Sequence, residues 1–206
     1  DDLPDEFFPA VRSFLNDLPQ MLAEYEGLIT GNEILQARTK GIGILSAEDA
    51  IKYGVTGSNL RASGIAYDIR KAEPYGIYDR FDFEVPLGKT GDCWDRTEVR
   101  MQEIVQSAAI ISQALILLPE GEIKAKVPRV IKPEKGTEVY HHIESSKGEL
   151  GFYIVSDGGE KPYRVHVRAP SFINMMVLPL ISRGYKLQDL IVNLASLDPV
   201  LGESDR

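Results

Sequence analysis

The spacing of apolar residues changes once along the chain, and this change limits the possible folds. From residue 92 to residue 118 apolar side chains, Ile104 among them, recur every three or four positions, as on the core-facing side of a long helix. Pro119 and Gly121 should end this helix. Beyond them the apolar residues alternate, which predicts short strands at 123–127, 139–143, 150–156 and 163–168, with a hairpin turn at 157–159. We therefore expect an α+β fold, mainly α, with long helices packed on a small antiparallel sheet.

Further helices are predicted on both sides of this sheet. A long helix should cover 7–29 and a shorter one 33–38, and Ser46 with Asp49 has the spacing of a capping box. Residues 54–91 show no sustained period, and two last helices should cover 171–183 and 187–196. With no repeat or linker, residues 1–206 are interpreted as a single unit. It comprises a helical part (1–118), the sheet (about 123–168), and the C-terminal helices and tail (171–206).

Composition excludes several classes of function. The formal net charge of −8 argues against nucleic acid or an anionic membrane surface as the main partner. No apolar run approaches the roughly 20 residues of a membrane span. Cys93 is the single cysteine, so an intramolecular disulfide and four-thiolate metal sites are excluded and a reducing compartment is expected. Because the sequence starts at Asp1 without Met or a secretory signal, we expect a piece of a longer protein.

The histidines and the cysteine give little support for catalysis. His141 and His142 are neighbours on a predicted strand, so their side chains should point to opposite faces and cannot readily share a metal. His166 fits a polar strand face, and Cys93 fits a buried structural role. The glycines form no phosphate-binding pattern. Two segments remain unexplained: 144–151, where Lys147 stands between acidic residues, and the charged tail 198–206.

These two segments belong to a series of motifs. In chain order they are TGSNLRASG at 56–64, GDCWDR at 91–96, KGELG at 147–151, SDGG at 156–159, YRVHVRAPSF at 163–172 and DPVLGESDR at 198–206. Together they resemble the C-terminal half of the 49-kDa-type subunit of respiratory complex I, an NADH:quinone oxidoreductase. This family is related to the large subunit of nickel-iron hydrogenases, whose fold the chain should share.

The hydrogenase relationship implies what has become of the metal site. The hydrogenase ending, similar to Asp-Pro-Cys-x-x-Cys-x-x-His, places its ligand positions on Val200, Glu203 and Arg206. An aliphatic residue and a lone carboxylate cannot replace the soft thiolate pair, so no metal is expected. The hydrogenase motif Glu-Ala-Pro-Arg-Gly falls on residues 144–148, where Lys147 keeps the positive charge with a different geometry.

The resemblance implies a quinone-site and scaffold subunit of a proton-pumping NAD(P)H:quinone oxidoreductase of translocase type (EC 7.1.1). Lys147, Val200, Glu203 and Arg206 would form one wall of a quinone pocket at the old metal site. The subunit would pack on an iron-sulfur subunit and other peripheral-arm subunits, at the cytoplasmic face of the membrane. Quinone is the substrate, the iron-sulfur clusters and FMN lie in other subunits, and this chain binds no cofactor. The family's His and Tyr quinone ligands lie outside this fragment, which should hold no catalytic residue and be inactive alone.

Two alternatives remain open. A non-enzymatic assembly subunit of the same complex would have its old cavity filled by side chains, and a filled cavity and an apolar pocket use the same residue types. An energy-converting nickel-iron hydrogenase is disfavoured by the missing thiolates at Val200 and Glu203. The electron donor and the quinone type stay open.

Overall fold

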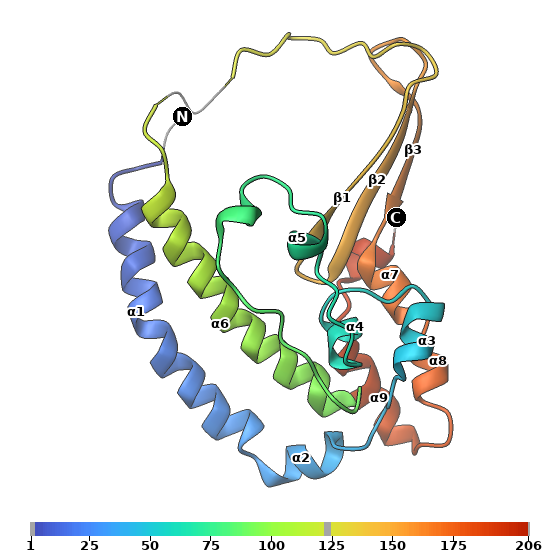
Figure 1. The fold of residues 1–206 in the computed structure, drawn as a ribbon. Helices are drawn as coiled ribbons and strands as arrows, with labels where there is room; N and C mark the ends of the chain where they lie inside the picture. Colours follow the sequence, from blue (N-terminus) through green and yellow to red (C-terminus); the bar gives the residue numbers. More distant parts are fainter. Residues whose placement is uncertain (1–2, 122–124, 206) are drawn as a thin grey trace.

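Two long helices lie side by side in the computed structural model, which describes residues 3–121 and 125–205 (Figure 1). Helix α1 spans Phe7–Tyr25 and continues into a π-helical turn, η1, at Glu26–Thr30. Helix α6 spans Cys93–Leu117, close to the predicted 92–118. The side chain of Asp92 caps α6 by accepting a hydrogen bond from the Asp95 amide. No helix among residues 3–121 and 125–205 is long and apolar enough to cross a membrane.

Short helices connect these two. The Ser46 hydroxyl caps α3 by accepting from the Asp49 amide, as its spacing predicts. Residues 54–91 are less irregular than expected, because they hold two short helices and a 3-10 turn pinned between longer elements. The elements between α1 and α6 are α2 (Glu33–Thr39), α3 (Ala47–Lys52), α4 (Ser58–Ala62), α5 (Ile69–Ala72) and η2 (Tyr78–Arg80).

A three-stranded antiparallel sheet follows in the order β1-β2-β3. The strands are β1 (Glu138–Ser145), β2 (Gly148–Ser156) and β3 (Pro162–Arg168). In its register Tyr140 faces Tyr153, and Tyr153 faces His166. The strand expected at 123–127 is wrong over 125–127, which pair with no strand; residues 122–124 lie outside the described chain. Pro128 directly follows that run, and a proline cannot donate to a ladder.

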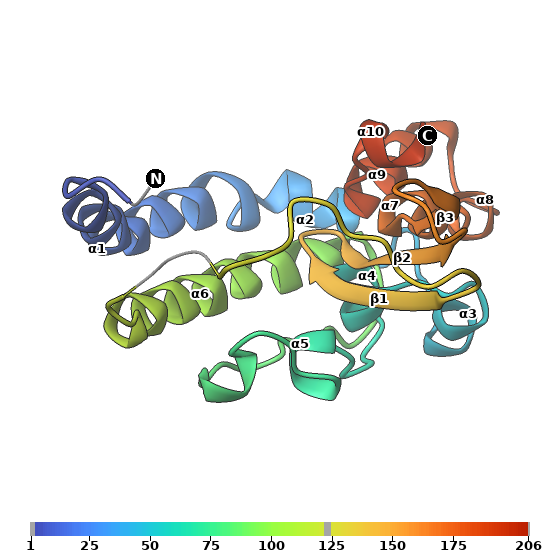
Figure 2. The same cartoon turned by 90° about the horizontal axis from the view of Figure 1, so that it is seen from above.

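The C-terminal helices pack beneath one end of the sheet, as the two views show (Figures 1 and 2). They are α7 (Pro170–Met175), α8 (Leu178–Ile181), α9 (Leu187–Leu197) and α10 (Leu201–Ser204). The single helix predicted at 171–183 is therefore wrong. Pro179 lies in the first turn of α8, where its missing amide hydrogen does no harm, whereas within one continuous helix it would leave a carbonyl unpaired.

The buried core lies at this C-terminal end. It brings together residues of α3, α4, α8 and α9 and their flanking loops: Leu45, Ala50, Val55, Leu60, Val177, Ile181 and Leu197. The apolar stripe of α6 is buried only near its start, because Ile104 is 40% exposed and Ile111 39%. The prediction that Ile104 is a core residue is wrong. The α+β class, mostly helical with a small sheet, is confirmed.

Candidate functional site

The turn that carries Lys147 is locked against the loop before α4. Gly148 has φ +127° and Gly57 has φ +71°, and their backbones touch. A Cβ on Gly148 would come 2.6 Å from Thr56 Oγ1, and one on Gly57 would come 2.6 Å from the Gly148 Cα. Both positions therefore require glycine. The Asn174 side-chain amide also donates to the Lys147 carbonyl at 3.1 Å, which fixes the turn from below.

Lys147 reaches the C-terminal segment. Its ammonium group forms an ion pair with the Asp198 carboxylate. Asp198 ends α9 in the left-handed conformation, with φ +52°, and also lies 3.6 Å from Arg100 Nε. The expectation that Lys147 and the segment around Val200 lie close together, despite their distance in sequence, is confirmed at Asp198.

Glu203 and Val200 are held by the start of α7. The Glu203 carboxylate accepts hydrogen bonds from the Ser171 amide at 3.1 Å and the Ser171 hydroxyl at 2.6 Å. A carboxylate at a helix N-terminus is favourable because it pairs with amides that have no partner within the helix. The Val200 amide donates to the same hydroxyl, and Val200 is 39% exposed. Arg206 lies outside the described residues. Of the four predicted site residues, the structure thus places Lys147 beside the tail, and ties Glu203 into that tail's docking.

A charged cleft opens on the other side of Asp198. Its volume is about 440 Å³. It lies between the start of α6, α4 and the β1–β2 turn, and most of its lining is polar. The lining residues are Arg61, Arg70, Arg100, Glu103, Ile104, Ser107, Glu144, Ser145, Ser146 and Asp198. Neither Val200 nor Lys147 lines it.

Arg61 is the centre of the ion network at this cleft. Its residue surface is only 3% exposed, and its guanidinium contacts Glu103 at 2.6 Å and Glu144 at 2.8 Å. Burial would lower the pKa of Arg61, but the two carboxylates raise it above its ordinary value. Burial raises the pKa of the Glu144 carboxyl, an effect that Arg61 opposes. The charges of the network therefore hold one another in place.

The sequence patterns do not reveal this cluster. Arg61 and Glu144 stand in the sequence only as parts of motifs, and Glu103 lies off the apolar stripe of its predicted helix. The available signal is Arg61 between the glycines of the 57–64 segment, since a glycine-flanked arginine can approach a backbone closely. Nothing in the sequence indicates that Glu103 and Glu144, 41 positions apart, meet at one guanidinium.

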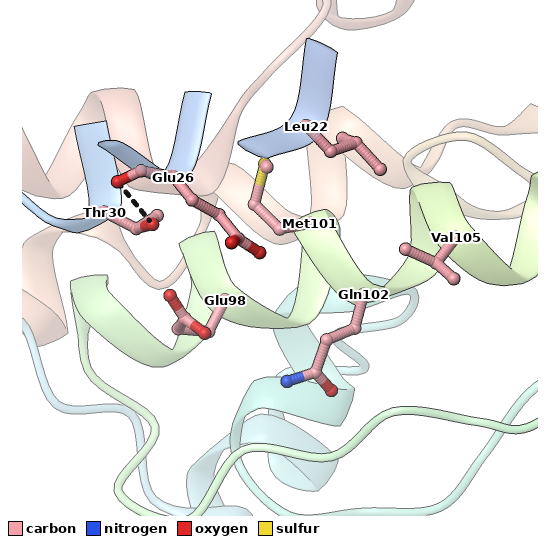
Figure 3. Close-up of a pocket in the computed structure, with 7 residues that line it drawn as sticks. All are labelled: Leu22, Glu26, Thr30, Glu98, Met101, Gln102 and Val105. Atoms are coloured by element: carbon pink, nitrogen blue, oxygen red, sulfur yellow. Dashed lines mark hydrogen bonds between the residues drawn. The ribbon is translucent and has the colours of Figure 1, made fainter. Parts of the chain in front are cut away.

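A second, smaller hollow lies on the opposite face of α6, against α1 (Figure 3). Its volume is about 140 Å³, and Figure 3 shows the carboxylates of Glu26 and Glu98 directed into it. Burial raises the pKa of Glu98, and the Glu26 carboxylate adds to the rise. No basic residue lines this hollow. It is a gap between two helices and is not connected to the Lys147 turn.

The remaining candidates adopt the expected structural roles. His142 lies between Glu149, at 2.8 Å, and Glu73, at 3.3 Å, whereas His141 is on the other face of the strand and is exposed. Cys93 is fully buried and donates to the Asn193 side chain at 3.2 Å. Within residues 3–121 and 125–205 no three His, Cys, Asp or Glu side chains are arranged to hold a metal ion.

The class that fold and site define is a mainly helical α+β chain with a docked C-terminal tail and a charged cleft beside it. The family model of the respiratory-chain NADH dehydrogenase 49 Kd subunit matches it over residues 1–137 and 131–206. The chain belongs to this family.

Curated relatives of high identity are all named as the same subunit of NADH-quinone oxidoreductase. Those of Clostridium beijerinckii and Desulforamulus reducens are 58% and 55% identical to this chain, over 100% and 99% of its length. The relative of the same name from Desulfitobacterium hafniense is 57% identical over 98% of this chain. These matches cover 55%, 56% and 55% of the three relatives, so the chain spans about half their length.

Proposed function

We propose that this chain is a quinone-site and scaffold part of an NAD(P)H:quinone oxidoreductase of the proton-pumping complex I type. The ion pair between Lys147 and Asp198 carries the proposal, because it joins the strand turn to the tail at the positions that would flank the old metal site. The names of the relatives support the same activity. In this proposal electrons reach quinone from an iron-sulfur subunit that packs on this one.

The remaining assignments follow from membership in such a complex. Val200 and its neighbours would form one wall of the quinone pocket, and the iron-sulfur clusters and FMN would belong to other subunits. The chain would lie at the cytoplasmic face of the membrane, held by its neighbours in the peripheral arm. It would be inactive alone, and its fold would share the ancestry of nickel-iron hydrogenase large subunits.

The test is the substitution Val200→Met in the whole membrane-bound complex. Added bulk at a pocket wall changes ligand fit by about 1 to 3 kcal/mol, so the KM for quinone or the response to quinone-site inhibitors should shift. Val130→Met, at an exposed valine outside helices and strands, is the matched control and should leave both unchanged. The amount of assembled complex is measured in parallel. Unchanged kinetics and inhibitor response for Val200→Met at normal abundance would favour the non-enzymatic assembly role.

A further inference from the structure

Arg61 has one nitrogen that the protein leaves available. Its Nε and Nη1 donate to Glu103, Glu144 and the Tyr67 carbonyl. Among residues 3–121 and 125–205, Nη2 has no hydrogen-bond partner, yet no fully buried side-chain nitrogen or oxygen lacks one. Nη2 therefore reaches open space. Since Arg61 is otherwise buried and lines the cleft, that space is the cleft.

Two more guanidiniums are placed in the same way. Arg100 donates through Nη2 to Asn59 and to the Ser196 carbonyl, and Arg70 donates through Nε and Nη2 to Asp68. In the described chain Nη1 of each arginine has no partner, and both residues line the cleft. Three fixed donors thus border one cleft.

The charges around the cleft balance. Against the three arginines stand the carboxylates of Glu103, Glu144 and Asp198, so the formal charge of the lining is zero. An anionic ligand would meet these carboxylates, and a cationic ligand would meet the arginines. A neutral ligand with oxygen atoms avoids both costs. It can accept from the guanidiniums or donate hydroxyl hydrogens to the carboxylates.

Size and surface limit the ligand further. A volume of about 440 Å³ is within the range of roughly 300 to 1,000 Å³ for small-molecule pockets. The planar guanidinium of arginine stacks on aromatic and conjugated rings, and Ile104 adds an apolar contact. A flat ring with oxygen atoms at opposite ends suits this lining.

We propose that the cleft binds the head group of a quinone, on the opposite side of Asp198 from Val200. The quinone carbonyls accept hydrogen bonds from Arg61 and Arg100, and the hydroxyls of the reduced form donate to Glu103, Glu144 or Asp198. Having donors and acceptors together lets one site hold both redox forms. The proposal rests on the proposed function, and differs from it in placing the head group against α6 rather than at the Val200 wall.

The experiment fills the cleft from α6. Ser107 lines the cleft, is exposed, and donates only to the carbonyl four residues earlier, that of Glu103. Ser112 is exposed on the same helix and makes the same bond to Ala108, but does not line the cleft. Ser107→Phe and Ser112→Phe are therefore matched variants. In the membrane-bound complex we would measure the KM for a water-soluble short-chain quinone and, separately, NADH oxidation by ferricyanide.

We expect Ser107→Phe to raise the quinone KM at least tenfold, with Ser112→Phe within twofold of wild type and ferricyanide reduction unchanged in both. A wild-type KM in Ser107→Phe at normal abundance would overturn the cleft assignment. If that variant fails to assemble, an azidoquinone photolabel on the wild-type complex decides. Label within 100–107 or 144–148 supports the cleft, and label only elsewhere overturns it. A wild-type complex that reduces no quinone at all would instead refute the proposed function.

Discussion

The two ends of α6 differ although one apolar stripe runs along the whole helix. At its start Cys93, Arg96 and Val99 are buried, and the Arg96 guanidinium has four hydrogen-bond partners. At its end Ile111 is 39% exposed and Ile116 81%. Helical periodicity shows which face of a helix needs cover, but not whether this chain supplies it. The exposed end indicates a surface that the remainder of the protein or a neighbouring subunit covers.

The largest effect is expected at the buried end, from Arg96→Met. Burial lowers the pKa of Arg96, but its hydrogen bonds hold the carbonyls of Gly43 and Gly91. Removing the donor leaves these buried acceptors unpaired, which should lower the free energy of unfolding by about 3 to 5 kcal/mol. Chemical denaturation of the purified chain measures it. Arg12→Met, on the exposed side of α1, is the control. Equal stability of the two variants would show that the buried end is not tightly packed.

A pair of truncations compares the two ends directly. Val99→Ala removes two buried carbons, because Val99 is 1% exposed, and should cost about 2 kcal/mol. Ile111→Ala removes partly exposed carbons and should change stability by less than about 0.5 kcal/mol in the isolated chain. Denaturant midpoints give both values. In the whole complex Ile111→Ala should instead reduce the abundance of this subunit, and equal abundance with wild type would argue against a covered surface.

The smallest effect should come from His142 and depend on pH. Burial lowers the pKa of His142, but its hydrogen bonds to Glu149 and Glu73 raise it above the ordinary value. A raised folded-state pKa stabilises the fold fully below the unfolded value of about 6.5, and the gain is lost as pH rises through the folded value. The free energy of unfolding of wild type should therefore fall from pH 6 to 9. His142→Gln should flatten this dependence, and His141→Gln should keep it.

The sequence predicted those elements whose signals are local. The bounds of α6, the Ser46 cap and the opposite faces of His141 and His142 follow from spacing alone. The break at Pro179 was also readable from the chain, since a proline in a predicted helix interior argues against continuity. Burial of Ile104 was predicted wrongly, because its periodicity is that of a core position while its cover is missing from this chain.

The site was predictable only where a family motif marked it. The meeting of Lys147 with the tail followed from the resemblance, and the ion pair to Asp198 agrees with it. The Arg61 cluster joins α4, α6 and β1, and no spacing rule predicts such a three-way contact. Tertiary ion networks depend on how elements pack, which a single sequence does not encode in any local pattern.

The contact between Gly57 and Gly148 has a consequence for how this region can vary. Each glycine is required because of the backbone of the other, so a side chain at either position moves the same turn and withdraws Lys147 from Asp198. The second substitution would add little to the damage done by the first, and the two effects would not sum. The loop at 56–64 and the turn at 145–148 should thus change together in evolution, as one inherited unit formed from two distant stretches of chain.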